Sequence, residues 1–310
     1  MTRYIYTALF CLLLLVISCG GGTSVKNDPA PSHPAQKHIQ KGVALYQRGC
    51  FQASLTAFMK AHELFSASDR LPGVAMSLNN IGNVYRYIGD TRSALLFFQE
   101  AYEIYSRLDD PKGRIQALAN KAAMLIQAER LDEATATIQR AKDLAESSDQ
   151  AVAQVLNNQG ILLTRQGQYD AAESVLLQAL AATDPENLHA RATAFSSLGN
   201  LMSEKSDYQK AIEYYNKALS LDRQTDFHAG LADNLKAIGR VYHQLDKHDR
   251  AASYFQRSIK IYALFNNQDQ VIRTLALLEE SAARSGMDLT VTRHFVEKWL
   301  KGEMLEHPCP

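Results

Sequence analysis

Small and large apolar residues follow one another along the chain in a fixed order, and this order occurs six times. In each copy a small residue is followed by a second small one, by a large apolar or aromatic one, and by a third small one. The first small residues lie 38 to 40 residues apart and are Gly42, Gly82, Ala122, Gly160, Gly199 and Gly239. A repeat of this length predicts one supersecondary unit that is copied and stacked along the chain.

The spacing of the apolar positions inside one copy predicts a pair of helices. In the second copy, Leu78, Ile81 and Tyr85 are three and four residues apart, which is the spacing of one helical face. The small residue at Gly82 would let the second helix cross the first closely, with Phe98 filling the space beside the crossing. Because one such pair cannot bury its apolar faces alone, neighbouring pairs must stack.

The order of these residues resembles the tetratricopeptide repeat (TPR) family over roughly residues 35 to 265. The fourth copy carries the resemblance most closely, with Gly160, Gly167, Tyr169, Ala172 and Ala179 in the family's order. The period exceeds the family's usual 34 residues and is similar to the longer Leu-Gly-Asn and kinesin-light-chain type. The resemblance implies an all-α fold, a right-handed α-α superhelix of six helical hairpins followed by a C-terminal capping hairpin.

Departures from the repeat pattern affect the turns and the last copy. Three copies depart from the family in the turn between the helices, where Glu129, Ser206 and Asp246 replace glycine. A seventh copy lacks the small residues, having Glu279 and Val291 in their place, which is typical of a solenoid cap. The predicted segments are 1–18 (signal peptide), 19–36 (lipidated cysteine and flexible tether), six units at about 37–73, 74–113, 114–151, 152–190, 191–230 and 231–268, a degenerate seventh unit or cap at 269–304, and a tail at 305–310.

The N-terminal segment predicts export and lipid anchoring. Arg3 precedes an apolar run from residue 8 to 17, which is too short to span a bilayer as a helix and fits a secretory signal. The sequence Val-Ile-Ser-Cys that ends at Cys19 resembles the bacterial lipobox, with valine where leucine is usual. The resemblance implies cleavage before Cys19 and acylation of that residue, for example by palmitate. An ordinary secreted protein is the alternative reading.

The residue after that cysteine is Gly20 rather than aspartate, which by the enterobacterial sorting rule implies the outer membrane. We therefore expect a lipid-anchored protein of the bacterial cell envelope that faces the periplasm. Residues 20–36 are rich in glycine, proline and polar residues and would form a flexible tether.

The remaining cysteines are expected to stay apart. Cys11 would be lost with the signal, and Cys50 and Cys309 would lie at opposite ends of an elongated solenoid. An intramolecular disulfide between them is therefore not expected, because the two Cα atoms of a disulfide must lie within about 7 Å. An intermolecular bridge or two unpaired thiols remain open.

The sequence offers little that indicates catalysis. It contains no phosphate-binding loop, zinc-protease helix, paired CxxC or hydrolase elbow. His243 and His248 lie at a helix end and in a turn, so no metal is predicted, and no cofactor either. The chain has 33 basic and 33 acidic residues, and without a basic stripe no nucleic-acid partner is expected.

The predicted binding surface follows from the TPR resemblance, since residues at fixed positions of the first helix line the concave groove in that family. The residues at those positions here are Asn79, Asn80, Asn83, Tyr87, Asn120, Asn157, Asn158, Arg165, Asn200, Lys236 and Arg240. Asparagine amides both donate and accept hydrogen bonds, so a ladder of them could pair with the main chain of an extended peptide. The plainer interpretation is that these are solvated helix residues.

The predicted function is a non-catalytic scaffold or adaptor that binds a protein or peptide in the periplasm and is held at the membrane through Cys19. A sensor that binds a peptide or small ligand in the same groove and changes the pitch of the solenoid is the alternative. A hydrolase with an unfamiliar site is a third. A homo-oligomer is not indicated.

Overall fold

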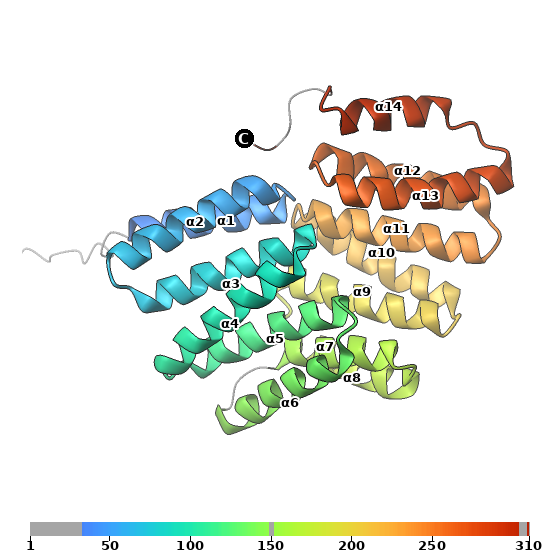
Figure 1. Ribbon diagram of the computed structural model, residues 1–310. Helices are drawn as coiled ribbons and strands as arrows, with labels where there is room; N and C mark the ends of the chain where they lie inside the picture. Colours follow the sequence, from blue (N-terminus) through green and yellow to red (C-terminus); the bar gives the residue numbers. More distant parts are fainter. Residues whose placement is uncertain (1–32, 149–151, 304–308, 310) are drawn as a thin grey trace, which may run out of the picture. The chain divides into compact units, whose positions relative to one another are not determined.

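The chain folds into consecutive helices. The computed structural model describes residues 33–148, 152–303 and 309, and these residues form 14 helices and no strand. The predicted signal peptide, Cys19 and tether residues 20–32 lie outside the described residues, as does most of the tail. Residues 34–36, predicted to belong to the flexible tether, instead form the first turn of α1, with Pro34 at its first position. The helices are α1 (Pro34–Gln47), α2 (Phe51–Ala67), α3 (Leu71–Ile88), α4 (Thr91–Arg107), α5 (Pro111–Gln127), α6 (Leu131–Ser148), α7 (Ala153–Arg165), α8 (Tyr169–Ala181), α9 (Leu188–Glu204), α10 (Tyr208–Gln224), α11 (His228–Gln244), α12 (His248–Leu264), α13 (Gln268–Ser285) and α14 (Thr290–Leu300) (Figure 1).

Consecutive helices from α1 to α12 pack as six pairs, and each pair packs on the next. The first helix of every pair begins within three residues of the unit boundary expected from the sequence. The predicted all-α superhelix of stacked hairpins is confirmed. Among the described residues no helix is both long and apolar enough to cross a membrane.

In five of the six units a glycine lies where the two helices of a pair cross, and the third unit has Ala122 there. A Cβ atom added at Gly82 would lie 2.6 Å from Cε1 of Phe98, and one added at Gly160 would lie 2.4 Å from Cγ of Leu176. Real Cβ contacts are longer than these distances, so a larger side chain would force the helices apart. The predicted pairing of the first small residue with the large residue of the second helix is therefore correct.

The turn inside each hairpin keeps one conformation whether or not it has glycine. Gly49, Gly89 and Gly167 have positive φ in three units, and Glu129, Ser206 and Asp246 have φ of 57°, 61° and 55° in the other three. The sequence departures therefore do not change the turn. Four of the turns between units also use this left-handed conformation, at Asp69, Asp109, Asp226 and Asn266, and Asp and Asn are the side chains that tolerate it best.

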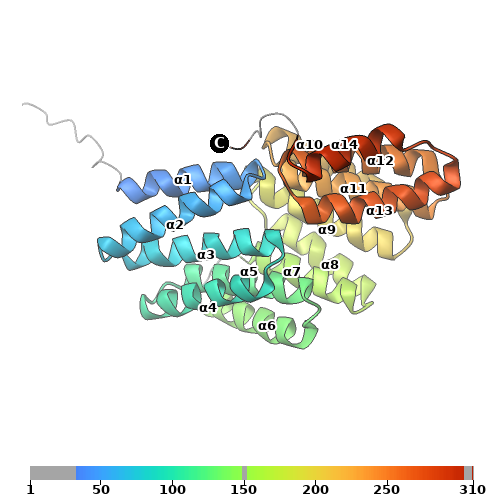
Figure 2. The same cartoon turned by 45° about the horizontal axis from the view of Figure 1, so that its top comes forward.

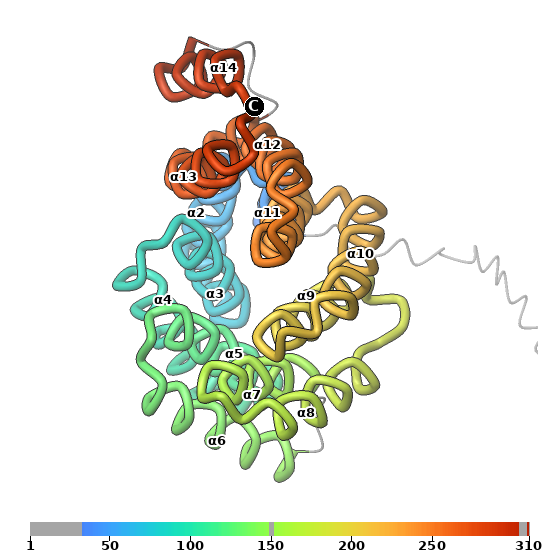
Figure 3. The backbone as a smooth tube through the Cα atoms, turned by 90° about the vertical axis from the view of Figure 1, so that its right-hand side faces the viewer, coloured from blue at the N-terminus to red at the C-terminus, as the bar shows by residue number. Residues whose placement is uncertain are grey.

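The stacked pairs form an inner and an outer layer. Figure 3 shows the odd-numbered helices from α3 to α11 on the inner side of the curve, with α4, α6, α8 and α10 outside them. The odd-numbered helices also contact one another from unit to unit. Side chains on these inner helices therefore line the face that the TPR resemblance assigns to partner binding.

The curve brings the first unit against the sixth. The turn after α1 lies beside α11 and α12 in two views (Figures 1 and 2), and a Cβ added at Gly49 would lie 3.2 Å from Cγ of Phe265. A disulfide joins Cys50 to Cys309, which are 259 residues apart in sequence, with their Cα atoms 5.3 Å apart. The prediction that these cysteines would not form an intramolecular disulfide was wrong, because it assumed an elongated solenoid whose ends stay apart.

The C-terminal helices cover the last unit incompletely. Helix α13 packs along α12, and in α14 only Val296 is buried. Phe295 and Trp299 stack with ring centroids 6.0 Å apart, as expected for residues four apart on one helix. Ile272 and Val291 remain more than half exposed, so apolar side chains of the cap face solvent.

Candidate partner-binding surface

Three of the asparagines expected to face a partner, Asn79, Asn120 and Asn158, instead link the inner helices to one another. Asn120 on α5 donates from Nδ2 to Oδ1 of Asn79 on α3 at 3.0 Å, and Gln154 on α7 donates to Oδ1 of Asn120 at 2.7 Å. Asn158 on α7 donates to the main-chain oxygen of Ala119 at 2.7 Å. The side chains thus form a hydrogen-bonded chain across three units.

This placement corrects the prediction of an open asparagine ladder. Asn79, Asn120, Asn157 and Asn158 are between 3% and 7% exposed, so they are not available to an incoming peptide in this conformation. The physical reason is the close approach of the inner helices, which places these positions between neighbouring units rather than on the free face. Asn157 differs from the other three because its Oδ1 atom is buried without a hydrogen-bond partner.

The remaining predicted residues are more accessible. Arg165, Asn200 and Arg240 are exposed on α7, α9 and α11. Arg165 lies 3.3 Å from the Glu129 carboxylate, and Asn200 accepts a hydrogen bond from the Tyr215 hydroxyl at 2.7 Å. The half-buried set comprises Asn80, which donates to the main-chain oxygen of its own helix at Met76, together with Asn83, Tyr87 and Lys236.

Two residues of the half-buried set meet at the Asp233 carboxylate. Tyr87 on α3 donates to Oδ2 of Asp233 on α11 at 2.9 Å, and Tyr262 on α12 donates to Oδ1. Lys236 lies 3.4 Å from the same carboxylate and donates to Oε1 of Gln270 at 2.7 Å. Burial and the nearby Asp233 carboxylate raise the pKa of Tyr87 and Tyr262 well above the ordinary value, so both hydroxyls remain donors.

Aromatic side chains surround this carboxylate on the inner side. Tyr87 stacks on Phe51 with centroids 4.5 Å apart and meets Phe227 edge-on at 6.4 Å. Phe227 also contacts Tyr46 at 6.5 Å and His189 at 4.5 Å. Burial, and secondarily the positive charge of Arg86, lowers the pKa of His189.

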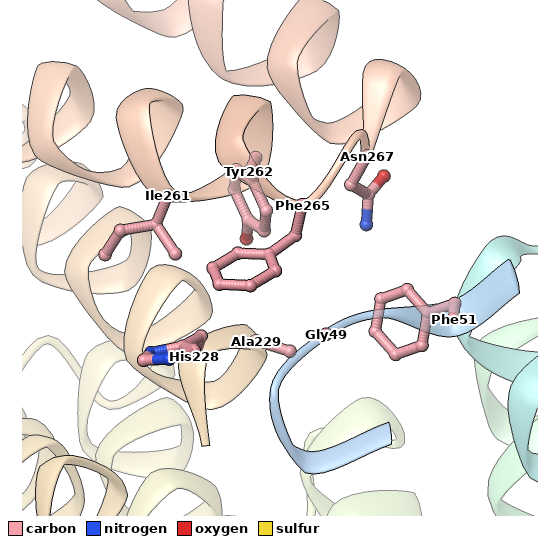
Figure 4. Close-up of a pocket in the computed structure, with 8 residues that line it drawn as sticks. All are labelled: Gly49, Phe51, His228, Ala229, Ile261, Tyr262, Phe265 and Asn267. Carbon is pink, nitrogen blue, oxygen red and sulfur yellow. The ribbon is translucent and has the colours of Figure 1, made fainter. Parts of the chain in front are cut away.

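These aromatic residues are far apart along the chain and lie outside the repeated pattern of small residues, so the pattern does not predict that they meet. A small hollow remains next to them, between the turn that holds Gly49 and the helices that hold His228 and Phe265 (Figure 4).

A buried carboxylate, that of Asp222, lies between units five and six. Asp222 at the end of α10 is 2% exposed and accepts from Nδ2 of Asn234 on α11 at 2.8 Å, and Asn234 in turn accepts from the Ser196 hydroxyl. Burial raises the pKa of Asp222 to about 7, and the hydrogen bond from Asn234 opposes this only in part. The Asp222, Asn234 and Ser196 side chains link neighbouring helices and lie away from solvent, so we assign them a structural role.

The two histidines considered for a metal lie together with their rings 5.0 Å apart. His243 is engaged with the buried Ser281 hydroxyl at 2.8 Å and with Glu280 at 3.3 Å, and His248 lies 3.5 Å from Asp246. Within the described ranges, no three histidine, cysteine or acidic side chains are grouped closely enough to hold a metal ion.

The fold and its layer of inner helices define a superhelical helix-repeat protein. The sequence pattern of the tetratricopeptide repeat family matches residues 34–107, 114–184 and 190–263, which is more than half of the chain. The chain belongs to the tetratricopeptide repeat family.

Known proteins resemble this chain over most of the repeats. Protein kinesin light chain-related 2 of Arabidopsis thaliana is 22% identical over 193 residues, which make up 59% of this chain and 29% of that protein. The chain thus spans less than a third of the length of this curated relative. The match agrees with the longer kinesin-light-chain type of repeat expected from the period.

Two solved structures share the fold. A Rap protein complexed with competence and sporulation factor gives a TM-score of 0.57 at 16% identity, over 81% of this chain and 76% of that one. A signal transduction ATPase with numerous domains and a tetratricopeptide repeat sensor, from Pyrococcus horikoshii, gives 0.53 at 15% identity, over 86% of this chain and 39% of that one. At these identities the likeness concerns the fold.

Proposed function

We propose that this protein is a non-catalytic scaffold that binds a protein or peptide partner on the inner face of its superhelix. The observation that carries the proposal is the set of exposed polar side chains on the inner helices (Figure 3), Arg165, Asn200 and Arg240. These side chains can donate hydrogen bonds to the main-chain carbonyls of an extended peptide. The similar Rap structure contains a bound factor, which supports binding by this class of fold.

The proposed location is the bacterial cell envelope, with the chain anchored through lipid on Cys19 at the outer membrane and facing the periplasm. Cys19 lies outside the described residues, so this proposal rests on the lipobox resemblance. The Cys50–Cys309 disulfide supports it, because disulfides persist in exported proteins and are rare in reducing compartments.

A photo-cross-linking experiment in native envelopes tests the proposed surface. A cross-linking amino acid at Arg240 on the inner helix α11 should capture a discrete partner, whereas the same group at Arg257 on the outer helix α12 should not. Both positions are exposed arginines of one hairpin, which makes them a matched pair. Equal capture at both positions, or capture at Arg257 alone, would reject the inner face as the binding surface.

The sensor function remains the alternative, and the contact between the first and sixth units favours it. A sensor needs a conformational element with two arrangements. A scaffold should co-purify with a stable partner from solubilised envelopes, whereas a sensor should change conformation on adding its ligand and retain little protein.

A further inference from the structure

The contact between the first two units and the sixth is made by aromatic side chains and by the turn at Gly49, rather than by helices that pack along one another. We call it the junction and define it by Phe51, Tyr87, Phe227, Asp233 and Phe265. No helix from α1 to α3 packs along α11 or α12 among the described residues, in contrast to every pair of consecutive helices from α1 to α8. The junction is therefore thin compared with the interfaces between neighbouring units.

The junction is also incompletely filled. The hollow in Figure 4 lies within it, with Gly49 and Phe51 on one side and His228, Ala229 and Phe265 on the other. Atoms that line such a space lose contacts on one side, so the interface gains less from packing than a filled one does. The hollow therefore reduces what packing contributes to closure at this point of the junction.

The polar link across the junction can be broken at low cost. The Asp233 side chain is 45% exposed, and it accepts the hydrogen bond from Tyr87 across the junction. On opening, water can replace the tyrosine hydroxyl at this carboxylate, and no buried charge is left without a partner. Opening the contact between the first two units and the sixth therefore leaves no unpaired buried charge at Asp233.

The covalent link lies at the edge of this junction. Cys50 is 2% exposed and packs with Leu45, Ala57 and Phe265, while Cys309 is half-buried. The bond is the one disulfide among the described residues. A reductant would reach the sulfur of Cys309 before that of Cys50.

We propose that the Cys50–Cys309 disulfide is a reversible clasp that holds the superhelix closed, and that its reduction opens the junction and the inner face. The effect on partner access rests on the proposed function, whereas the opening itself does not. Opening the clasp requires a dithiol reductant, because dithiols exchange with protein disulfides.

Reduction of the clasp takes two exchange steps. In the first, a thiolate of the dithiol attacks Sγ of Cys309, the bond to Cys50 breaks, and Cys50 leaves as a thiolate that takes up a proton. The second thiol of the reductant then attacks the mixed disulfide and releases Cys309 as a thiol. The reductant becomes a disulfide, and two electrons and two protons pass to the two cysteines.

Energy transfer between two dyes tests the opening in the full chain in detergent. Dyes attached through unnatural amino acids at Arg48 and Gln268 lie on exposed positions on the two sides of the junction. Dyes at Glu129 and Arg165, whose side chains meet between units three and four, form the matched control. Transfer is compared in the oxidised protein, after dithiothreitol, and in a Cys50→Ser variant.

We expect reduction and Cys50→Ser to lower the transfer across the junction, with the control pair and the helical circular dichroism unchanged. Unchanged transfer across the junction would overturn the clasp, because the other contacts would then be sufficient. Loss of helical signal on reduction would also overturn it, because the bond would then be needed for folding rather than for closure.

The effect on access is tested separately by cross-linking at Arg240 in wild-type and Cys50→Ser envelopes. Several-fold greater capture by the variant supports control of access. Equal capture rejects that control but leaves inner-face binding in place. Absence of capture in both rejects the proposed function, while the dye measurement still decides whether the clasp exists.

Discussion

Replacing Gly82 by alanine tests the packing that defines the repeat. The new Cβ would lie 2.6 and 2.7 Å from Cε1 and Cδ1 of Phe98, a ring that is fully buried and has little room to move. Overpacking of this kind costs about 1–3 kcal/mol, whereas the better helix propensity of alanine returns up to about 1 kcal/mol. We expect Gly82→Ala to lower the free energy of unfolding by about 1–2 kcal/mol.

The third unit suggests how to relieve this clash. It has Ala122 and Ile138 at the two positions that Gly82 and Phe98 occupy in the second, and both are buried. The double variant Gly82→Ala/Phe98→Ile should therefore be more stable than the sum of the two single changes predicts, with a coupling of about 1 kcal/mol. All variants are compared with the Cys50–Cys309 disulfide intact, so that the state of this bond does not change their unfolding transitions.

Chemical denaturation followed by circular dichroism measures these differences. Ala136 is exposed in the middle of α6, so Ala136→Gly gives the propensity contribution without a packing change. A Gly82→Ala variant as stable as the wild type, or additive effects in the double variant, would show that the helices do not need glycine at this crossing.

Three further predictions follow from buried or reactive side chains. Since burial raises the pKa of Asp222 to about 7, the folded state binds this proton more tightly than the unfolded state, and the free energy of unfolding should fall as pH rises from about 4 to about 7. Asp222→Asn should remove up to about 4 kcal/mol of this loss. Parallel curves of stability against pH for the two proteins would contradict this role of Asp222. Asn120→Ala leaves the buried amide oxygen of Asn79 without its donor and should cost about 1–3 kcal/mol, against less than about 0.5 kcal/mol for exposed Asn216→Ala, as measured by thermal unfolding. Cys19→Ala should abolish incorporation of labelled palmitate and release the protein from membranes, and a labelled or membrane-bound variant would remove the lipobox assignment.

The repeat itself could be predicted from the sequence because it depends on contacts within one unit. Gly160 and Leu176 lie 16 residues apart within one copy, so the repeat pattern shows both positions in every copy. The same reasoning could have found a second set of glycines. Gly73 and Gly113 are 40 residues apart, and a Cβ at either would lie 2.3–2.4 Å from an aromatic ring of the preceding helix.

The closure of the superhelix could not be predicted because it depends on a rotation that accumulates over six units. A small error in the angle between neighbouring pairs is multiplied at each step, so the sequence of one unit does not fix where the first meets the sixth. This is why Cys50 and Cys309 were expected to lie apart, and why Tyr87 and Asp233 were not connected.

The candidate surface was predicted in part for a related reason. Residues such as Asn120 were assigned to the inner helices from the repeat frame, but the frame gives no distance between neighbouring inner helices. Because those helices approach closely, the amide of Asn120 meets Asn79 rather than solvent. Arg165 and Arg240 remain exposed, and their role in binding is a prediction that the cross-linking experiment can test.

The bond between Cys50 and Cys309 also changes how the protein would come apart. Solenoids fray from their termini, because an end unit has a neighbour on one side only. Here the first hairpin is held on both flanks, by the second hairpin and by the covalent tie beside Phe265. While that tie is intact, the amino-terminal hairpin cannot peel away freely, and loss of structure there becomes coupled to loss at the opposite end of the array.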